Sequence, residues 1–92
     1  MEHLSAEDRE QFLAEHPEWS LDGETITRTF VFDDFVEAMG FVTKVAIAAE
    51  VADHHHDIDI RWNKVTLSLS THSEKALTTN DTELAAKADS YG

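Results

Sequence analysis

Apolar and polar residues alternate in four stretches of this chain, which is the pattern of half-buried β-strands. The stretches form two pairs, and each pair is joined by a short connection that favours a tight hairpin. The first pair is 19–21 and 24–32, with Asp22-Gly23 at the turn. The second pair is 57–62 and 65–70, with Asn63-Lys64 at the turn. The sequence therefore predicts two antiparallel hairpins.

Side-chain alternation also indicates which residues of these strands face a core. Ile26, Phe30 and Phe32 share one face of the longest stretch, and Arg28 interrupts that face, as expected near a sheet edge. Trp62 alternates in phase with the two isoleucines of its own stretch. We therefore expect Trp62 to pack against neighbouring strands rather than to contact a ligand.

Two short helices are indicated at the ends of the chain. Ser5, followed three residues later by Asp8, resembles a capping box and predicts a helix over 6–15. Thr78 and Asp81 have the same spacing and open the last helix. The apolar face of that helix comprises Leu84, Ala85 and Ala88.

The longest helical pattern begins at Asp33 or Asp34, either of which can cap a helix, and reaches about Asp53. Its apolar stripe comprises Phe35, Met39, Val42, Val45, Ala46, Ala49 and Ala52. A second group widens this surface and comprises Phe41, Ile47, Ala48 and Val51. Gly40 costs about 1 kcal/mol here relative to alanine, a cost that close packing against a neighbouring element would offset. Because a small domain cannot readily cover so broad a surface, we expect a homodimer or homotetramer.

The predicted element order is αββαββα, which places the chain in the α+β class. We expect one two-layer domain over residues 1–92, in which a four-stranded antiparallel sheet packs on helices. No repeat, linker or low-complexity tract interrupts this order.

Charge and composition narrow the function classes. Nineteen acidic residues against seven lysines and arginines give a net charge of -12, which disfavours nucleic acid as a ligand. The acidic surface fits either ordinary solubility or a high-salt cytoplasm, where self-repulsion is screened. The chain has no cysteine, and no run approaches the ~20 apolar residues of a membrane span. We expect a cytoplasmic protein that binds neither membrane nor nucleic acid.

Four of the six histidines lie between residues 50 and 81, and neutral imidazole can give or take a proton near pH 7. In the predicted topology the polar residues of this region follow the ends of different elements. These residues are Glu50, His54, His55, His56, His72 and Asp81. Because element ends meet at one edge of a sheet, the region predicts a proton-transfer site that lacks a nucleophile.

The same residues resemble the signature of the pterin-4a-carbinolamine dehydratase family. That signature is a glutamate, three residues, His-His-Pro, an aromatic residue, Thr-His, and Gly-Leu-Thr leading to an aspartate. It is met by Glu50, His54, His55, Trp62, Thr71-His72, Leu77-Thr78 and Asp81. His56 stands in place of the usual proline and Ala76 in place of the common glycine, which affects backbone freedom but removes no proton carrier. The element order agrees with the family over nearly the whole chain.

The resemblance implies removal of water from a 4a-hydroxytetrahydropterin, which regenerates quinonoid dihydropterin after an aromatic amino acid hydroxylase has turned over. The reaction needs a proton on the leaving oxygen and the loss of one from the neighbouring ring nitrogen, and no metal or redox cofactor. The catalytic histidines map onto His54, His55 and His72. We assign His54 and His72 to proton transfer and His55 to holding the pterin. Asp81 orients an imidazole or accepts a pterin N–H, and Glu50 sets a tautomer.

Other interpretations of these residues stay open at this point. The histidines could simply end a helix or a strand, and Asp81 could serve only the first turn of its helix. A His-rich metal site would draw ligands from the three consecutive histidines, Asp53, Asp57 and His72, but consecutive side chains seldom converge on one ion. A non-catalytic interaction module is the third alternative, because animal members of the resembled family also act as dimerisation partners of a homeodomain transcription factor.

Overall fold

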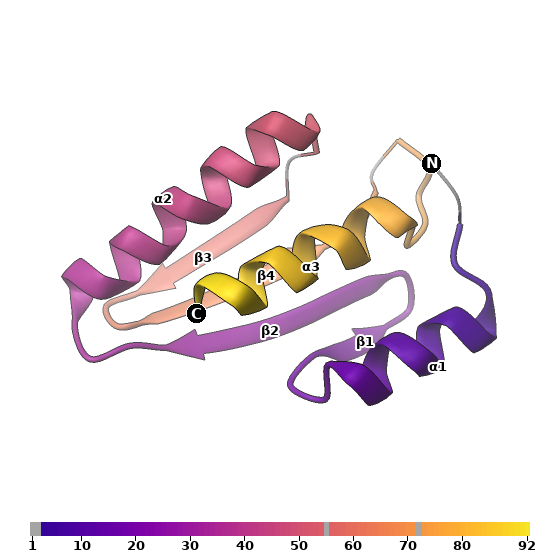
Figure 1. Cartoon of the computed structure of the whole chain (residues 1–92), viewed down its shortest axis with the longest axis horizontal. Helices are drawn as coiled ribbons and strands as arrows, with labels where there is room; N and C mark the ends of the chain where they lie inside the picture. Colours follow the sequence, from indigo (N-terminus) through magenta and orange to yellow (C-terminus); the bar gives the residue numbers. More distant parts are fainter. Residues whose placement is uncertain (1–2, 55, 72) are drawn as a thin grey trace.

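The computed structural model describes residues 3–54, 56–71 and 73–92. Its elements follow the predicted order (Figure 1). They are α1 (Ala6–Glu15), β1 (Ser20–Asp22), β2 (Thr25–Val31), α2 (Phe35–Ala52), β3 (Asp57–Arg61), β4 (Lys64–Leu69) and α3 (Thr79–Tyr91). The α+β class is therefore confirmed. All three predicted helices begin at their predicted caps, Ser5, Asp34 and Thr78.

The strands form one antiparallel sheet in the order β1-β2-β4-β3. Both hairpin turns lie one residue away from their predicted positions. Asp22 pairs with Thr25, so the first turn is Gly23-Glu24, and Gly23 supplies the left-handed backbone there with a φ of 61°. Arg61 pairs with Lys64, which makes Trp62-Asn63 the second turn. The first shift places Glu24 outside the strands.

Arg28 lies on β2 just beyond the end of β1. The pairing of β1 with β2 stops at Ser20 and Thr27, and Arg28 pairs with Leu67 of β4. This register agrees with the predicted position at a sheet edge. The Arg28 guanidinium donates a hydrogen bond to Asp89 of α3 at 2.8 Å and lies 4.1 Å from the centre of the Phe30 ring. This ion pair and cation–π contact replace much of its hydration.

The prediction for Trp62 is wrong. Trp62 lies at the tip of the β3–β4 hairpin with a φ of 52°, and it is 65% exposed. The turn interrupts the alternation of β3, so Trp62 does not continue the sheet face on which Ile58 and Ile60 lie. The next residue, Asn63, holds the tip against the end of β2, since its side-chain amide donates to the Phe32 carbonyl at 2.9 Å.

The helices cover one face of the sheet, and the core lies between the two layers (Figure 1). Side chains from every helix and from the inner sheet face meet there. The larger members are Phe12, Trp19, Ile26, Phe30, Phe41, Val45, Val65, Leu67, Leu69 and Leu84. The predicted apolar face of α3 is confirmed, because Leu84, Ala85 and Ala88 are all buried.

Helix α2 buries only part of the predicted stripe. Its buried residues are Ala38, Phe41, Val45, Ala48 and Ala49, and of these Val45 and Ala49 belong to that stripe. Phe35 and Met39, which begin the predicted stripe, are 49% and 36% exposed. Apolar residues lie on nearly every side of this helix, so their spacing alone cannot select the face that meets the sheet.

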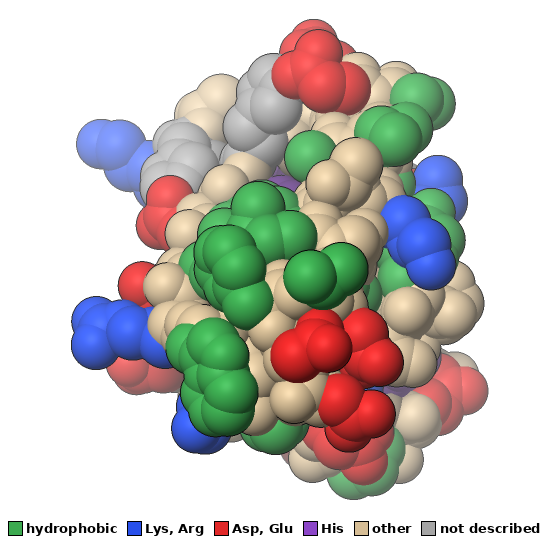
Figure 2. Space-filling model, turned by 90° about the vertical axis from the view of Figure 1, so that its left-hand side faces the viewer, with side chains coloured by type: hydrophobic (Ala, Val, Ile, Leu, Met, Phe, Trp, Pro, Cys, Tyr) green, Lys and Arg blue, Asp and Glu red, His purple; other side chains and the backbone are tan. Residues whose placement is uncertain are grey.

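The opposite side of α2 leaves large apolar side chains in solvent. Val36, Ile47 and Val51 are its most exposed members. Figure 2 shows apolar side chains beside acidic ones at the end of the molecule where α2 begins. Within the described residues, no helix has the length and apolar character needed to cross a membrane.

Gly40 gives a direct test of packing on α2. A β-carbon added there would meet no atom within 4 Å, so the predicted close packing is absent from this chain. We expect Gly40→Ala to raise the free energy of unfolding by about 0.5 to 1 kcal/mol, because alanine restricts the unfolded chain more than glycine does. Urea denaturation measures this change.

Gly23→Ala is the matched control, because its site is equally open but has a φ of 61°. It should destabilise the protein, since only the backbone conformation distinguishes the two positions. Destabilisation by Gly40→Ala would instead show that another molecule packs closely on this side of α2.

Candidate active site

His54 owes its position to the way α2 ends. Asp53 adopts a left-handed conformation with a φ of 51°, which aspartate tolerates better than most residues. The Asp53 N–H then donates to the Glu50 carbonyl at 3.1 Å, and the His54 N–H donates to the Ala49 carbonyl at 3.0 Å. This Schellman arrangement satisfies the last carbonyls of the helix and turns the chain inward. As a result His54 is only 7% exposed.

Asp81 is placed by the start of α3. It occupies the third position of that helix, and its Oδ2 accepts the backbone N–H of Thr78 at 2.9 Å. The predicted pairing of Thr78 with Asp81 is thus confirmed. The Asp81 side chain is fully buried, with an exposure of 0%. A carboxylate at such a depth needs several donors to replace its lost hydration.

The two side chains meet although 27 residues separate them in sequence. His54 Nε2 lies 2.5 Å from Asp81 Oδ1. Ionised carboxylate only accepts hydrogen bonds, so Nε2 must carry the proton of this contact. In the neutral imidazole Nδ1 then holds the lone pair. The pair therefore fixes one tautomer of His54 and leaves Nδ1 able to accept a proton.

Two threonines complete the surroundings of Asp81. Thr71 Oγ1 donates to Asp81 Oδ2 at 2.9 Å and lies 2.7 Å from Thr78 Oγ1. Because the Thr71 hydroxyl has already given its proton to the carboxylate, Thr78 donates to Thr71. Both threonines are buried. Each polar group of this set has a defined partner, which holds the carboxylate in one orientation.

His56 lies close enough to His54 and Asp81 for their charges to affect its pKa. Both ring nitrogens are buried, and neither has a hydrogen-bond partner of good geometry among the described residues. Burial is the largest influence on the pKa of His56 and lowers it below its usual value of 6.5. The polar backbone of His54 and the carboxylates of Asp81 and Asp57 raise this pKa, while the charge of the His54 ring lowers it. The neutral imidazole is therefore favoured at this position.

The structure brings two of the predicted site residues, His54 and Asp81, into direct contact. Glu50 lies on the exposed side of α2 and lines a surface depression of about 390 Å³. His55 and His72 lie outside the described residues, so their predicted roles stay predictions. Thr71 was noted in the sequence only as part of the Thr-His pair. Its bond to Asp81 depends on the strand ending beside α3, which no local pattern indicates.

The described residues contain no group of three or more His, Cys, Asp or Glu side chains arranged to hold a metal ion. Asp81 Oδ2 already accepts hydrogen bonds from Thr71 and Thr78, and His54 Nε2 is bonded to Asp81 Oδ1. The geometry in this part of the chain is that of an oriented imidazole, a group suited to moving protons.

Comparison with known proteins places this chain in a family. The profile described as "Pterin 4 alpha carbinolamine dehydratase" matches residues 2–91. The chain belongs to the pterin carbinolamine dehydratase family. A relative from Chloroflexus aurantiacus, named "Putative pterin-4-alpha-carbinolamine dehydratase", is 48% identical over 97% of this chain and 96% of its own length. A protein of the same name from Roseiflexus castenholzii is 50% identical over 87% of this chain and 86% of its own length.

Solved structures agree with the family fold. The crystal structure of a "transcriptional coactivator/pterin dehydratase" from Brucella melitensis superposes with a TM-score of 0.91 at 36% identity, covering 98% of each chain. A "pterin dehydratase-like protein", described as a RuBisCO assembly factor in the alpha-carboxysome, has a TM-score of 0.66 at 16% identity. It covers 79% of this chain and 84% of its own, and shares the fold.

His56 should make stability depend on pH. Its pKa is lower in the folded chain than in the unfolded one, so the unfolded state binds more protons as pH falls below about 6.5 and stability decreases. His56→Leu removes that loss, because leucine does not titrate. The variant's free energy of unfolding minus that of the native chain should therefore increase as the pH is lowered from about 7.5 to about 5.5. Urea denaturation at several pH values measures it, and a constant difference would contradict the buried neutral imidazole.

Proposed function

We propose that this protein dehydrates 4a-hydroxytetrahydropterin to quinonoid dihydropterin by histidine acid-base catalysis. The bond from carbon 4a to its hydroxyl oxygen breaks, the neighbouring ring nitrogen loses its proton, and a double bond forms between that carbon and nitrogen. The oxygen leaves as water once a proton has reached it. The two proton transfers, to the leaving oxygen and from the ring nitrogen, are steps that an imidazole can carry out near pH 7.

The buried pair of His54 and Asp81 is the observation that carries this proposal. An imidazole at a helix end usually faces solvent, whereas His54 is buried and held by a carboxylate at 2.5 Å. With Nε2 engaged, Nδ1 is the nitrogen that exchanges a proton with the pterin. Asp81 has its oxygens occupied by protein donors and is fully buried, which favours orienting the imidazole over contacting the pterin.

The remaining roles complete the proposed site. His72 acts with His54, one imidazole giving a proton to the leaving oxygen while the other takes a proton from the ring nitrogen. His55 holds the pterin, and Glu50 contributes to substrate binding beside the end of α2. The reaction would recycle the pterin of an aromatic amino acid hydroxylase.

A second function is an interaction module, which the exposed apolar side of α2 favours. The solved relative from Brucella melitensis carries both "transcriptional coactivator" and "pterin dehydratase" in its description. An interaction role would use the surface of α2 around Val36, Ile47 and Val51, not the buried imidazole. The two functions therefore use separate residues and can be tested separately.

The same surface leads us to propose that the chain assembles into a homodimer or homotetramer through α2. Large apolar side chains on one helix side are stabilised when a second copy covers them. The net charge of -12 makes two copies repel each other, and salt screens that repulsion. Assembly should therefore strengthen as ionic strength rises.

The catalytic proposal is tested by a dehydration assay on a 4a-carbinolamine generated by a hydroxylase. We expect His54→Ala and His72→Ala each to lower kcat about 100- to 10,000-fold, with a smaller change in KM, because each removes a proton-transfer group. The double variant should lose less than the product of the single losses, since both groups serve one step. His56→Leu should retain most of the turnover.

His16 supplies a matched control. Its Nδ1 lies 2.7 Å from Asp89 Oδ2, so it is another imidazole–carboxylate pair, on the other end of α3. His16→Ala should leave kcat near the native value. The assignment is wrong if His54→Ala and His72→Ala fold and assemble normally and both turn over at nearly the native rate.

The assembly proposal is tested by light scattering across ionic strength. We expect a dimer or tetramer whose fraction increases with salt, and we expect Val51→Lys to shift it toward monomer because a charge would enter the apolar contact. Ala86→Lys, at an exposed position on α3, makes the same charge change of one unit away from that contact. A native chain that stays monomeric at every salt and micromolar concentration would refute the interface.

A further inference from the structure

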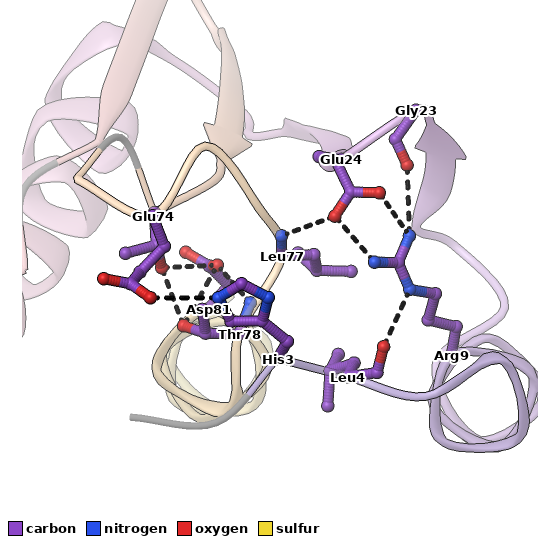
Figure 3. A network of polar contacts seen from close by, with 10 residues as sticks. His3, Leu4, Arg9, Gly23, Glu24, Glu74, Leu77, Thr78 and Asp81 are labelled. Carbon is purple, nitrogen blue, oxygen red and sulfur yellow. Dashed lines mark hydrogen bonds and ion pairs between the residues drawn. The ribbon is translucent and has the colours of Figure 1, made fainter.

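A second charged pair lies outside the candidate active site, on the side of α3 that faces the N-terminal segment. The Arg9 guanidinium of α1 makes two hydrogen bonds to Glu24, at 2.9 Å and 2.6 Å (Figure 3). It also donates to the carbonyls of Leu4 and Gly23, each at 3.3 Å. One arginine thus connects α1, the segment before it and the β1–β2 turn.

Glu24 extends this connection to the loop that leads into α3. Its Oε1, which accepts from Arg9, also accepts the backbone N–H of Leu77 at 3.0 Å. From the other side, the Leu4 N–H donates to the Leu77 carbonyl at 3.1 Å. The backbone of Leu77 is therefore held at both its donor and its acceptor, and its side chain is buried.

The Leu77 carbonyl and the Thr78 N–H belong to one planar peptide group. Leu4 holds the carbonyl end of that plane, and the N–H end donates to Asp81 Oδ2 at 2.9 Å. A rotation of the plane would weaken both bonds together. Leu4 holds this plane directly, whereas Glu24 holds the preceding Ala76–Leu77 peptide group through the Leu77 N–H. The two planes share the Leu77 Cα, so the orientation of the carboxylate that binds His54 depends on both.

We propose that Arg9 and Glu24 are positioning residues for the Asp81 carboxylate and, through it, for the His54 tautomer. This inference rests on the proposed function for its kinetic consequence. Arg9 and Glu24 touch neither His54 nor Asp81 directly. They act through the peptide group before the one that donates to Asp81, because Glu24 holds the Leu77 N–H and Arg9 holds Glu24.

The charge state of the pair supports this role. The hydrogen bonds from Arg9, and then from Leu77, lower the pKa of Glu24 from 4.5 to about 2. For a carboxyl with a lowered pKa, the stabilisation is present above about pH 4.5 and is lost as pH falls toward about 2. Glu24 therefore stays ionised over the whole range in which an imidazole changes charge.

The test compares variants that separate the ion pair from the hydrogen bond to Leu77. Glu24→Ala removes both, whereas Glu24→Gln keeps an oxygen that can accept the Leu77 N–H. In the exchange variant Arg9→Glu with Glu24→Arg, opposite charges are restored but no acceptor faces Leu77. Arg61→Ala is the control, since Arg61 and Asp59 form an exposed pair on β3 at 3.4 Å.

We expect Glu24→Ala and the exchange variant to lower kcat about 10- to 100-fold with KM changed less than about threefold, because a small misplacement of a catalytic group has effects of this size. Glu24→Gln should recover most of the rate, and Arg61→Ala should match the native protein. Nitrogen NMR of the His54 ring should show the proton fixed on Nε2 in the native chain and a mixture of tautomers in Glu24→Ala. If Glu24→Ala does not fold, Arg9→Lys, which keeps the charge but not the two-pronged contact, should show the same changes at smaller size.

The ring spectrum keeps this inference separate from the proposed function. If the native protein has no dehydratase activity but Glu24→Ala releases the tautomer, the positioning role stands and the catalytic proposal fails. If Glu24→Ala lowers stability but leaves both kcat and the His54 ring spectrum unchanged, the pair is merely structural and the inference is overturned. Recovery of kcat in the exchange variant would also overturn it, because the ion pair alone would then suffice.

Discussion

The burial of one carboxylate constrains the arrangement of this end of the molecule. Asp81 is enclosed completely, and an ionised group at that depth is tolerated only when protein donors replace its water. The donors come from three places: the first residue before α3, the segment after β4 and the end of α2. Each of these segments must therefore stop at a fixed point, and Asp81 ties three element ends to one another.

Because Asp81 must meet donors from several element ends, the helix caps affect the geometry of the site as well as the stability of their own helices. The left-handed Asp53 ends α2 at the residue before His54, and the cap at Thr78 begins α3 three residues before Asp81. A helix longer or shorter by one residue would rotate the following side chain by about 100°. Secondary-structure boundaries thus set the geometry of the imidazole–carboxylate pair, with the sheet providing the surface on which both helices rest.

Local signals in the sequence predicted these boundaries well. Ser5, Asp34 and Thr78 cap their helices as their spacing to later polar residues indicated. The turns were less predictable, because Asp22-Gly23 and Gly23-Glu24 both suit a hairpin and only the pairing of Asp22 with Thr25 decides between them. The buried stripe of α2 could not be selected either, since its apolar residues surround the helix and the sheet chooses among them.

The residues of the candidate site were also predictable only in part. His54 and Asp81 were expected together because one follows the end of the long helix and the other lies in the first turn of the last helix, and the structure joins them. The contributions of Thr71 and of Glu24 could not be predicted, because each depends on contacts between segments far apart in the chain. Threonine and glutamate are common on surfaces, so their identity alone carries no such signal.

Asp81 both binds His54 and caps the start of α3. These two roles limit how descendants of this chain can diverge. Replacing His54 removes one of the donors to the carboxylate and leaves the bonds from Thr71 and Thr78 in place. Replacing Asp81 would leave three buried donors without an acceptor and would release the start of α3. Selection for a new role can therefore discard the imidazole at the cost of one donor to the carboxylate, while the carboxylate persists as an inherited part of the scaffold long after any proton chemistry has ceased.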